Sequence, residues 1–242
     1  MYRKLKKLGQ PIIGGIKMDQ LLYTVSDVYG AIQGEGCQSG IPMVILRLQG
    51  CSVGCHFCDT KQTWKIDKSN EVEAFVDALG DTPKYVKKTG QQIADYIAMQ
   101  FPVFEWILLT GGEPAEQDLQ ELVFALRGRG YKVALETSGT AEGHVGVQFD
   151  WVCVSPKIGM PGGKTIKASA IRPADEIKFV VGKEADLYKL AAFLQQYPTK
   201  AGCTICLQPM SQSPKATHLC IEACQALGYR LSVQIHKLIN QR

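Results

Sequence analysis

Three cysteines stand close together on one short segment: Cys51, Cys55 and Cys58 follow one another with the spacing C-x3-C-x2-C. Three thiolates on one loop can converge on one metal centre, and thiolates favour zinc and iron–sulfur clusters. Structural zinc takes four protein ligands, and the nearest fourth candidate, His56, is crowded between two of the cysteines. A four-iron cluster held by three cysteines leaves one iron free to bind a substrate or cofactor. The spacing therefore favours a cluster, and zinc remains the alternative.

A second polar segment, TGGEP at residues 110–114, ends an apolar run that begins at residue 105. Its glycines allow the backbone to approach a ligand closely. Three further polar segments, at residues 136–140, 155–157 and 208–211, also follow apolar runs. In folds with parallel sheets such loops gather at the carboxyl ends of the strands, where ligands bind. We therefore expect these segments to meet the cysteine loop (residues 51–58) at one site.

Strand-like apolar runs alternate with helical patterns along most of the chain. Strands are predicted at residues 42–49, 105–110, 132–136, 151–155, 176–181, 204–208 and 230–234, and helices at 71–79, 90–100, 116–127, 184–197 and 215–227. Because this alternation needs long crossovers, the strands should run parallel. The sequence predicts an α/β fold, a single-domain partial (β/α) barrel with mostly parallel strands, over residues 21–242. Segment 65–88 has few apolar anchors and is expected to be an insertion over the site.

The bulk composition excludes several classes of protein. The chain has 242 residues with 45% hydrophobic residues and a net charge of +4, which is too small to imply nucleic-acid binding. No apolar run approaches the roughly 20 residues that span a bilayer. Nine cysteines, an odd number, do not suit a secreted disulfide scaffold, so we expect a reducing cytoplasm. Residues 1–20 form a basic extension without a secretory signal, and we expect a mobile tail.

The cysteine loop carries an aromatic residue, Phe57, immediately before its third cysteine. Together with TGGEP, this C-x3-C-x-aromatic-C pattern resembles the radical S-adenosylmethionine enzymes. The resemblance implies a 4Fe-4S cluster on Cys51, Cys55 and Cys58, whose free iron is chelated by S-adenosylmethionine, and a fold of that superfamily's type. It also implies that TGGEP holds the amino group of S-adenosylmethionine. An external reductant such as flavodoxin or ferredoxin would supply the electron that cleaves the sulfonium and starts the radical chemistry.

Finer motifs narrow the resemblance. QGEG at residues 33–36, RLQGC at 47–51, CDT at 58–60 and QIHK at 234–237, with the loops above, resemble the 7-carboxy-7-deazaguanine synthase family over residues 22–242. The resemblance implies a carbon–nitrogen lyase of queuosine biosynthesis, a tRNA modification pathway. Its substrate would be 6-carboxy-5,6,7,8-tetrahydropterin and its product 7-carboxy-7-deazaguanine, formed with loss of ammonia. The family also implies a homodimer and a Mg²⁺ ion, which takes oxygen ligands and would here bind through Thr60.

The family's site residues map onto this sequence position by position. Arg47 also stands out by itself, because it interrupts an apolar strand and could pair with a substrate carboxylate through two hydrogen bonds. Glu35 and His236 are additional candidates, with a turn residue and an end-of-chain side chain as the alternatives. The resemblance implies substrate contacts from Ile32, Gln33, Gly34, Arg47 and Thr110, and S-adenosylmethionine contacts from Phe57, Cys58, Asp59, Gly112, Ser138, Ser155, Pro156, Lys157 and Gln208.

Six cysteines lie outside the cysteine loop. Cys203 and Cys206 are three apart at a strand start and should point to opposite faces, so core packing is expected. Cys220 and Cys224 share a helix face that is also expected in the core, while Cys37 and Cys153 have no partner that the sequence identifies. Two other functions stay open. One is a glycyl-radical-enzyme activase, which shares the cysteine spacing, and the other is a zinc-stabilised binding module.

Overall fold

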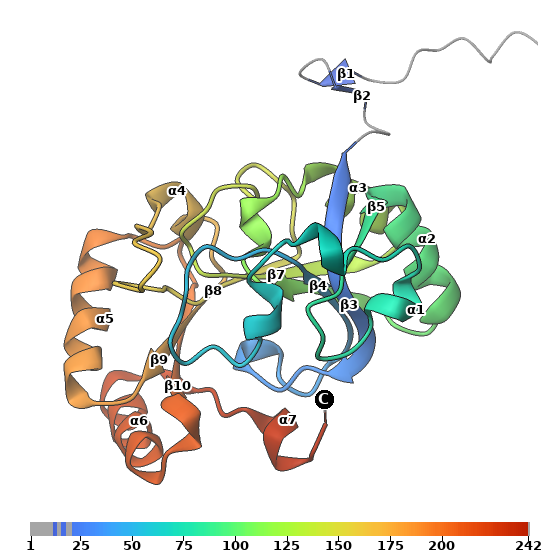
Figure 1. Ribbon diagram of the computed structural model, residues 1–242. Coiled ribbons are helices and arrows are strands. Elements are labelled where there is room, and N and C mark those ends of the chain that lie inside the picture. Colours follow the sequence, from blue (N-terminus) through green and yellow to red (C-terminus); the bar gives the residue numbers. More distant parts are fainter. Residues whose placement is uncertain (1–11, 14–15, 18–20, 242) are drawn as a thin grey trace, which may run out of the picture.

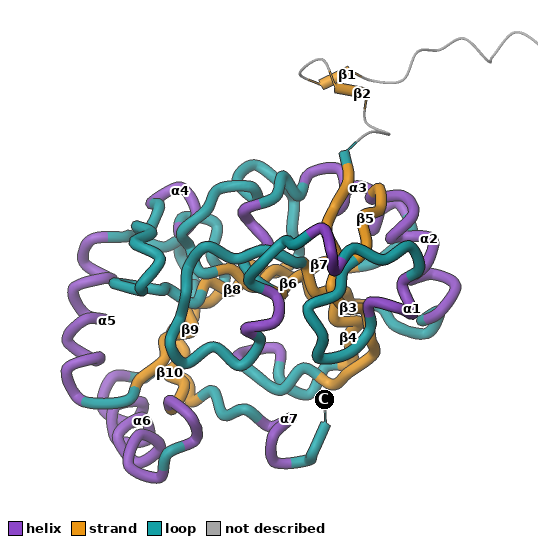
Figure 2. The backbone as a smooth tube through the Cα atoms, viewed as in Figure 1, coloured by secondary structure: helices purple, strands orange, loops and turns teal. Residues whose placement is uncertain are grey.

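The computed structural model describes residues 12–13, 16–17 and 21–241, so most of the predicted basic extension lies outside the described residues. A single sheet of nine strands, in the order β11-β10-β9-β8-β7-β6-β4-β3-β5, organises the fold. The order ends at β5 without returning to β11, and Figures 1 and 2 show a curved, open sheet with helices along its outer side. The strands are β3 (Leu22–Ile32), β4 (Pro42–Leu48), β5 (Val86–Thr89), β6 (Trp106–Gly111), β7 (Lys132–Thr137), β8 (Trp151–Val154), β9 (Glu176–Val181), β10 (Thr204–Pro209) and β11 (Arg230–Leu231).

The strands from β4 to β11 along this sheet are all parallel neighbours, which confirms the predicted partial barrel. Two short strands, β1 (Ile12–Ile13) and β2 (Ile16–Lys17), form a separate antiparallel pair. The helices are α1 (Phe75–Ala78), α2 (Gly90–Gln100), α3 (Gln120–Gly128), α4 (Ala168–Ile171), α5 (Glu184–Gln196), α6 (Pro214–Leu227) and α7 (Ile235–Leu238). None in the described part of the chain has the length and hydropathy to cross a membrane.

Side chains of β4 show how the sheet separates core from site. Val44, Leu46 and Leu48 belong to the large core cluster that includes the buried side chains of α2 and α3. Met43 and Ile45 belong to a second, smaller cluster with Leu108 of β6. Because side chains alternate along a strand, Arg47 shares the face of Met43 and Ile45. That face is the inside of the open barrel.

Several predicted elements differ from the observed ones. The antiparallel strand β3, which pairs with both β4 and β5, was not predicted. The helix predicted at 71–79 is wrong except for α1, because the backbone around Val72 pairs with Tyr85 instead. The helix predicted at 116–127 starts only at Gln120, since residues 114–116 form a 3-10 turn. The strand predicted at 230–234 ends at Leu231, because the chain leaves the sheet edge to reach the segment after β3.

Segment 65–88 is only partly an insertion over the site. Phe75, Ala78 and Val86 are buried in the large core cluster, and β5 joins the sheet through β3. Asp81 lines the cavity described below. The expectation that this segment lies outside the core is therefore wrong from Phe75 onward.

Candidate active site

One cavity of about 560 Å³ lies at the carboxyl ends of the parallel strands. The loops after β4, β6, β7, β8 and β10 contribute to its wall, together with the segment after β3 and the segment around α7. The predicted site residues that line it are Cys51, Cys55, Cys58, Thr60, Ile32, Gln33, Gly34, Arg47, Thr110, Phe57, Asp59, Gly112, Ser138, Ser155, Lys157 and Gln208. Glu35 and His236 line it as well, whereas Pro156 is buried behind the wall.

The cysteine loop presents its three thiols to the cavity. The Sγ of Cys58 accepts hydrogen bonds from the Thr60 backbone N–H and the Trp64 Nε1–H, each at 3.4 Å. Such donors stabilise a thiolate that ligates an iron–sulfur cluster.

The TGGEP loop (residues 110–114) packs directly on the cysteine loop. The Gly112 N–H donates to the Leu48 carbonyl and the Glu113 N–H to the Gly50 carbonyl, each at 2.9 Å. A Cβ atom at Gly112 would lie 2.1 Å from the Gly50 carbonyl oxygen, so no larger residue fits there. The glycine requirement therefore comes from the contact between the two loops, and this contact keeps both at one end of the cavity.

Glu113 joins the TGGEP loop to the next loop along the sheet. Glu113 is only 2% exposed. Its carboxylate accepts hydrogen bonds from the Thr137 hydroxyl and the Ser138 N–H at 2.6 Å, and from the Ala115 N–H at 3.0 Å. Burial raises the pKa of Glu113, and these hydrogen bonds oppose that rise. Glu113 is thus a positioning residue that sets where Ser138 faces the cavity.

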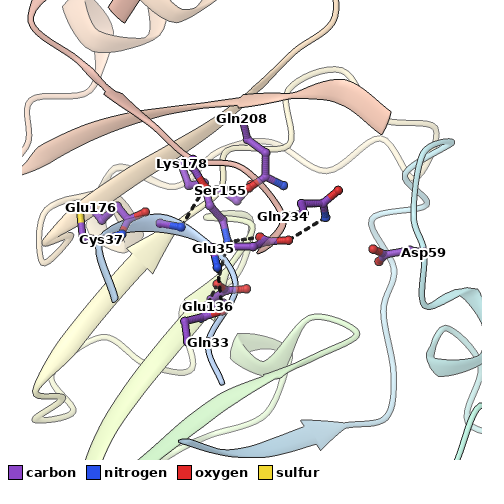
Figure 3. A network of polar contacts seen from close by, with 12 residues as sticks. Gln33, Glu35, Cys37, Asp59, Glu136, Ser155, Glu176, Lys178, Gln208 and Gln234 are labelled. Carbon is purple, nitrogen blue, oxygen red and sulfur yellow. Dashed lines mark hydrogen bonds and ion pairs between the residues drawn. The ribbon is translucent and has the colours of Figure 1, made fainter. Parts of the chain in front are cut away.

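A buried cation and two carboxylates form the opposite wall (Figure 3). The Lys178 side chain is 4% exposed, and its Nζ lies 2.6 Å from Glu35 Oε2 and 2.7 Å from Glu136 Oε1. Burial opposes the charge of Glu35, but the ammonium of Lys178 outweighs it and lowers the pKa of Glu35. Burial likewise opposes the charge of Lys178, and the two carboxylates raise its pKa well above the ordinary value. Lys178 and Glu35 therefore form an ion pair at neutral pH.

Amide side chains extend this triad on both sides. Gln33 Nε2 donates to Glu136 Oε1 at 3.4 Å, and its Oε1 accepts from the Glu35 N–H at 3.1 Å. Gln234 Nε2 donates to Glu35 Oε1 at 2.7 Å. The Ile235 N–H donates to the Gly34 carbonyl at 2.9 Å, which brings α7 beside the segment after β3 (Figure 1). The QGEG loop (residues 33–36) and the QIHK segment are thus held together at the cavity.

Other predicted residues complete the wall with positive charge. Arg47 Nη2 donates to the Tyr29 hydroxyl at 3.1 Å. The Lys157 Nζ lies 5.7 Å from the centre of the Phe57 ring and donates to the Ser155 hydroxyl. Burial lowers the pKa of Lys157. These cations stand beside the carboxylates, so the cavity offers both donors and acceptors to a polar ligand.

Glu136 and Lys178 are site residues to which the sequence analysis assigned no role. Both stand in apolar strands, β7 and β9, at positions facing the inside of the barrel. A charged residue inside an otherwise apolar strand needs a buried partner. That signal was present in the sequence for Lys178, as it was for Arg47, but the identity of the partner was not.

Comparison with known proteins identifies the relatives of this chain. The sequence model of the Radical SAM superfamily matches residues 45–147. The 7-carboxy-7-deazaguanine synthase of Escherichia coli (strain K12) is 38% identical over 220 residues, which are 90% of this chain and 98% of that protein. The protein of the same name from Buchnera aphidicola subsp. Schizaphis graminum (strain Sg) is 36% identical over 92% of this chain and 100% of its own length.

A solved structure agrees with the sequence relatives. The crystal structure of QueE from Escherichia coli superimposes with a TM-score of 0.83 and 36% identity, over 90% of this chain and 96% of that chain. On identity and coverage together, this chain belongs to the 7-carboxy-7-deazaguanine synthase family of the radical S-adenosylmethionine superfamily.

Proposed function

We propose that this protein converts 6-carboxy-5,6,7,8-tetrahydropterin to 7-carboxy-7-deazaguanine with loss of ammonia. The observation that carries the proposal is the polar wall of Lys178, Glu35 and Glu136, which faces the same cavity as the cysteine loop. Relatives that carry the name of this activity cover most of the chain and support it. The proposal places the protein in queuosine biosynthesis.

The wall has the chemistry that a carboxylated pterin requires. A pterin edge carries N–H donors, and carboxylates such as Glu35 and Glu136 accept hydrogen bonds from them. The substrate carboxylate needs a cation, and the guanidinium of Arg47 can bind it through two hydrogen bonds. Gln33 and Thr110 add groups that both donate and accept. In this proposal the chain's own residues orient the ring, exclude water and hold its charges.

The cysteine loop and its neighbours have the donors that the cofactors require. Cys51, Cys55 and Cys58 would hold a 4Fe-4S cluster. Gly112, Ser138, Ser155, Lys157 and Gln208 would surround S-adenosylmethionine, with Pro156 supporting that wall from behind. When bound, the cluster and S-adenosylmethionine supply one-electron radical chemistry that no amino-acid side chain of the cavity supplies.

Thr60 is the proposed protein ligand of a Mg²⁺ ion. Thr60 lines the cavity, and its Oγ1 lies 3.6 Å from Cys58 Sγ, beside the proposed cluster. Replacing Thr60 by alanine removes one neutral oxygen, so the Mg²⁺ concentration for half-maximal activity should rise by roughly tenfold, or about 1.4 kcal/mol. The visible spectrum of the cluster should stay unchanged. Thr60→Ser keeps the hydroxyl and should behave as the wild type; loss of the cluster in Thr60→Ala would contradict the assignment.

The reaction itself is tested with anaerobically reconstituted protein. It is incubated with S-adenosylmethionine, a reductant, Mg²⁺ and 6-carboxytetrahydropterin, and the products are analysed by mass spectrometry. We expect 7-carboxy-7-deazaguanine, methionine and 5′-deoxyadenosine. An intact cluster that cleaves S-adenosylmethionine but yields no deazapurine would refute the substrate and return the glycyl-radical-enzyme activase to first place. A protein that contains zinc without iron or sulfide would instead favour the binding module.

The proposal extends to partners and location. We propose flavodoxin or ferredoxin as the reductant, a homodimer as the assembled form and the cytoplasm as the location. The cytoplasm is supported by nine free cysteines, which a reducing compartment preserves. Neither nucleic acid nor a membrane is a proposed partner.

A further inference from the structure

Two cysteines from distant parts of the chain meet one layer below the active-site cavity. Cys37, in the short turn after the QGEG loop, and Cys206, on β10, have Sγ atoms 3.6 Å apart. One carboxylate oxygen of Glu176, on β9, joins them, and the three ligand atoms lie within 4.8 Å of one another. Cys206 and Glu176 are each 1% exposed. None of these three residues takes part in the site proposed above.

One oxygen of Glu176 lacks a partner. Its Oε2 accepts hydrogen bonds from the Cys37 N–H at 3.0 Å and the Trp151 Nε1–H at 3.4 Å. Its Oε1 is buried and has no hydrogen-bond partner among the described residues. Gly36, with a φ of +66°, leaves that oxygen room, because a Cβ there would lie 2.2 Å from it. A buried carboxylate oxygen without a partner is costly, so this arrangement points to a missing cation.

The distance between the two sulfurs distinguishes a metal site from a disulfide. Two thiolates on one tetrahedral zinc ion lie about 3.8 Å apart, given Zn–S bonds of about 2.3 Å. A disulfide needs about 2.05 Å. The observed 3.6 Å is too long for a disulfide; it is a hydrogen-bond distance between the two thiols and lies close to the spacing of two thiolates on one metal ion. Two sulfurs and one oxygen also select zinc over Mg²⁺ or Ca²⁺, which prefer oxygen ligands throughout.

The charges around Cys37, Cys206 and Glu176 balance such an ion. Two thiolates, one carboxylate and Zn²⁺ sum to one negative charge. Arg230, on the edge strand β11, stands opposite Cys206 in the sheet register. Its side chain also hydrogen-bonds to Cys37. The guanidinium therefore lies where the remaining negative charge needs a counterion.

We propose that Cys37, Cys206 and Glu176 bind one Zn²⁺ ion, with solvent at the fourth position. Solvent can reach that position because Cys37 is only half-buried. Side chains alternate along a strand, so Glu176 and Cys206 face the same side as Lys178 and Gln208 and lie directly beneath them. Figure 3 shows Cys37 beside Glu176, at one end of the polar network. The ion would fasten the QGEG loop to β9 and β10, from below the proposed substrate wall.

The test measures metal content and coordination, so it does not depend on the proposed reaction. Anaerobic holoenzyme is incubated with zinc, passed through a column with a weak chelator and analysed for zinc and iron. We expect about one tightly held zinc ion beside the about four irons of the cluster. Zinc X-ray absorption should show two sulfurs at about 2.3 Å and lighter oxygen ligands.

Variants test whether the zinc ion is bound by Cys37, Cys206 and Glu176. Cys206→Ser, Cys37→Ser and Glu176→Gln should each weaken zinc binding by at least about 100-fold, because each removes a charged ligand. The matched control is Cys220→Ser, an equally buried cysteine on α6, which should leave zinc content unchanged. Iron content checks that every variant is folded. If the variants at the buried residues do not fold, Cys37→Ser alone carries the test.

Three outcomes overturn the proposal. Wild-type protein that retains no more zinc than a Cys37→Ser/Cys206→Ser variant would show that the site does not bind zinc. X-ray absorption that gives three sulfurs on zinc would assign the ion to the cysteine loop. Mass spectrometry of unreduced protein that finds Cys37 and Cys206 joined in a disulfide would exclude the site as well.

Discussion

Replacing Cys55 by alanine is expected to remove the cluster and to lower product formation by roughly three orders of magnitude or more, since no side chain replaces the cofactor's chemistry. Cys55 is one of three thiols on the cavity wall, and a three-cysteine cluster has no spare ligand. Iron and sulfide content, the visible absorption band and deazapurine formation are the measurements. All of these quantities should fall together.

The control for this substitution is Cys224→Ser. Cys224 lies on α6, among the partly buried side chains packed against the main core and away from the cavity. The variant should keep both cluster and activity. A Cys55→Ala protein that retains its iron and sulfide would show that the cluster is held elsewhere, and the assignment of the cysteine loop would then be wrong.

Replacing Lys178 by methionine should have the largest effect on stability. It leaves the carboxylates of Glu35 and Glu136, whose side chains are 16% and 24% exposed, without their cation, and breaking a buried ion pair costs about 3–5 kcal/mol. The free energy of unfolding, from denaturant titration, measures the loss. The matched control is Lys189→Met, whose ion pair with Asp186 is 57% exposed on the lysine side. Exposed pairs contribute about 0–1 kcal/mol, so a similar loss in both variants would contradict the proposed triad.

The pH dependence of stability checks the same triad. In the wild type the pKa of Glu35 is lowered below its ordinary 4.5, so its contribution is present above that pH and is lost as pH falls through the lowered value. Lys178 has a raised pKa, so its contribution is present below 10.5 and is lost as pH rises through the raised value. The stability that Glu35 and Lys178 contribute in the wild type should therefore be constant between these limits.

The stability of the Lys178→Met variant, unlike that of the wild type, should change between pH 7 and pH 5. Without the ammonium, burial and the neighbouring carboxylate raise the pKa of at least one of the two glutamates. A group with a raised pKa gains stability as pH falls towards it, so the variant should become more stable between about pH 7 and pH 5. Equal pH profiles for variant and wild type would show that the carboxylates do not depend on Lys178.

The parallel part of the sheet was predictable because its strands are continuous apolar runs, such as residues 176–181, which match β9. Strand β3 was missed because Ser26, Asp27 and Gly30 interrupt its apolar residues. Its antiparallel pairing with β4 and β5 compensates for those interruptions. The helix expected at 71–79 was wrong because backbone pairing with Tyr85 outweighed a local helical pattern. Local sequence patterns therefore predicted the strands that are buried on both faces. They did not predict the elements whose structure depends on contacts with distant residues.

The candidate site was predictable to the extent that its residues stand in motifs. The predicted residues line one cavity, apart from Pro156. The contacts among side chains were not predictable. Lys178 meets Glu35 across 143 positions, and Cys37 meets Cys206 across 169. No spacing rule in one sequence links such residues. The expectation that Cys203 and Cys206 pack in the core is confirmed, since Cys206 is buried and Cys203 packs, partly buried, against the large core cluster.

The hydrogen bond between Gln234 and Glu35 joins residues 199 positions apart. During synthesis, a ribosome therefore has to translate nearly the whole described chain before Gln234 can reach Glu35. Until then the cavity lacks the part of its wall that the QIHK segment contributes.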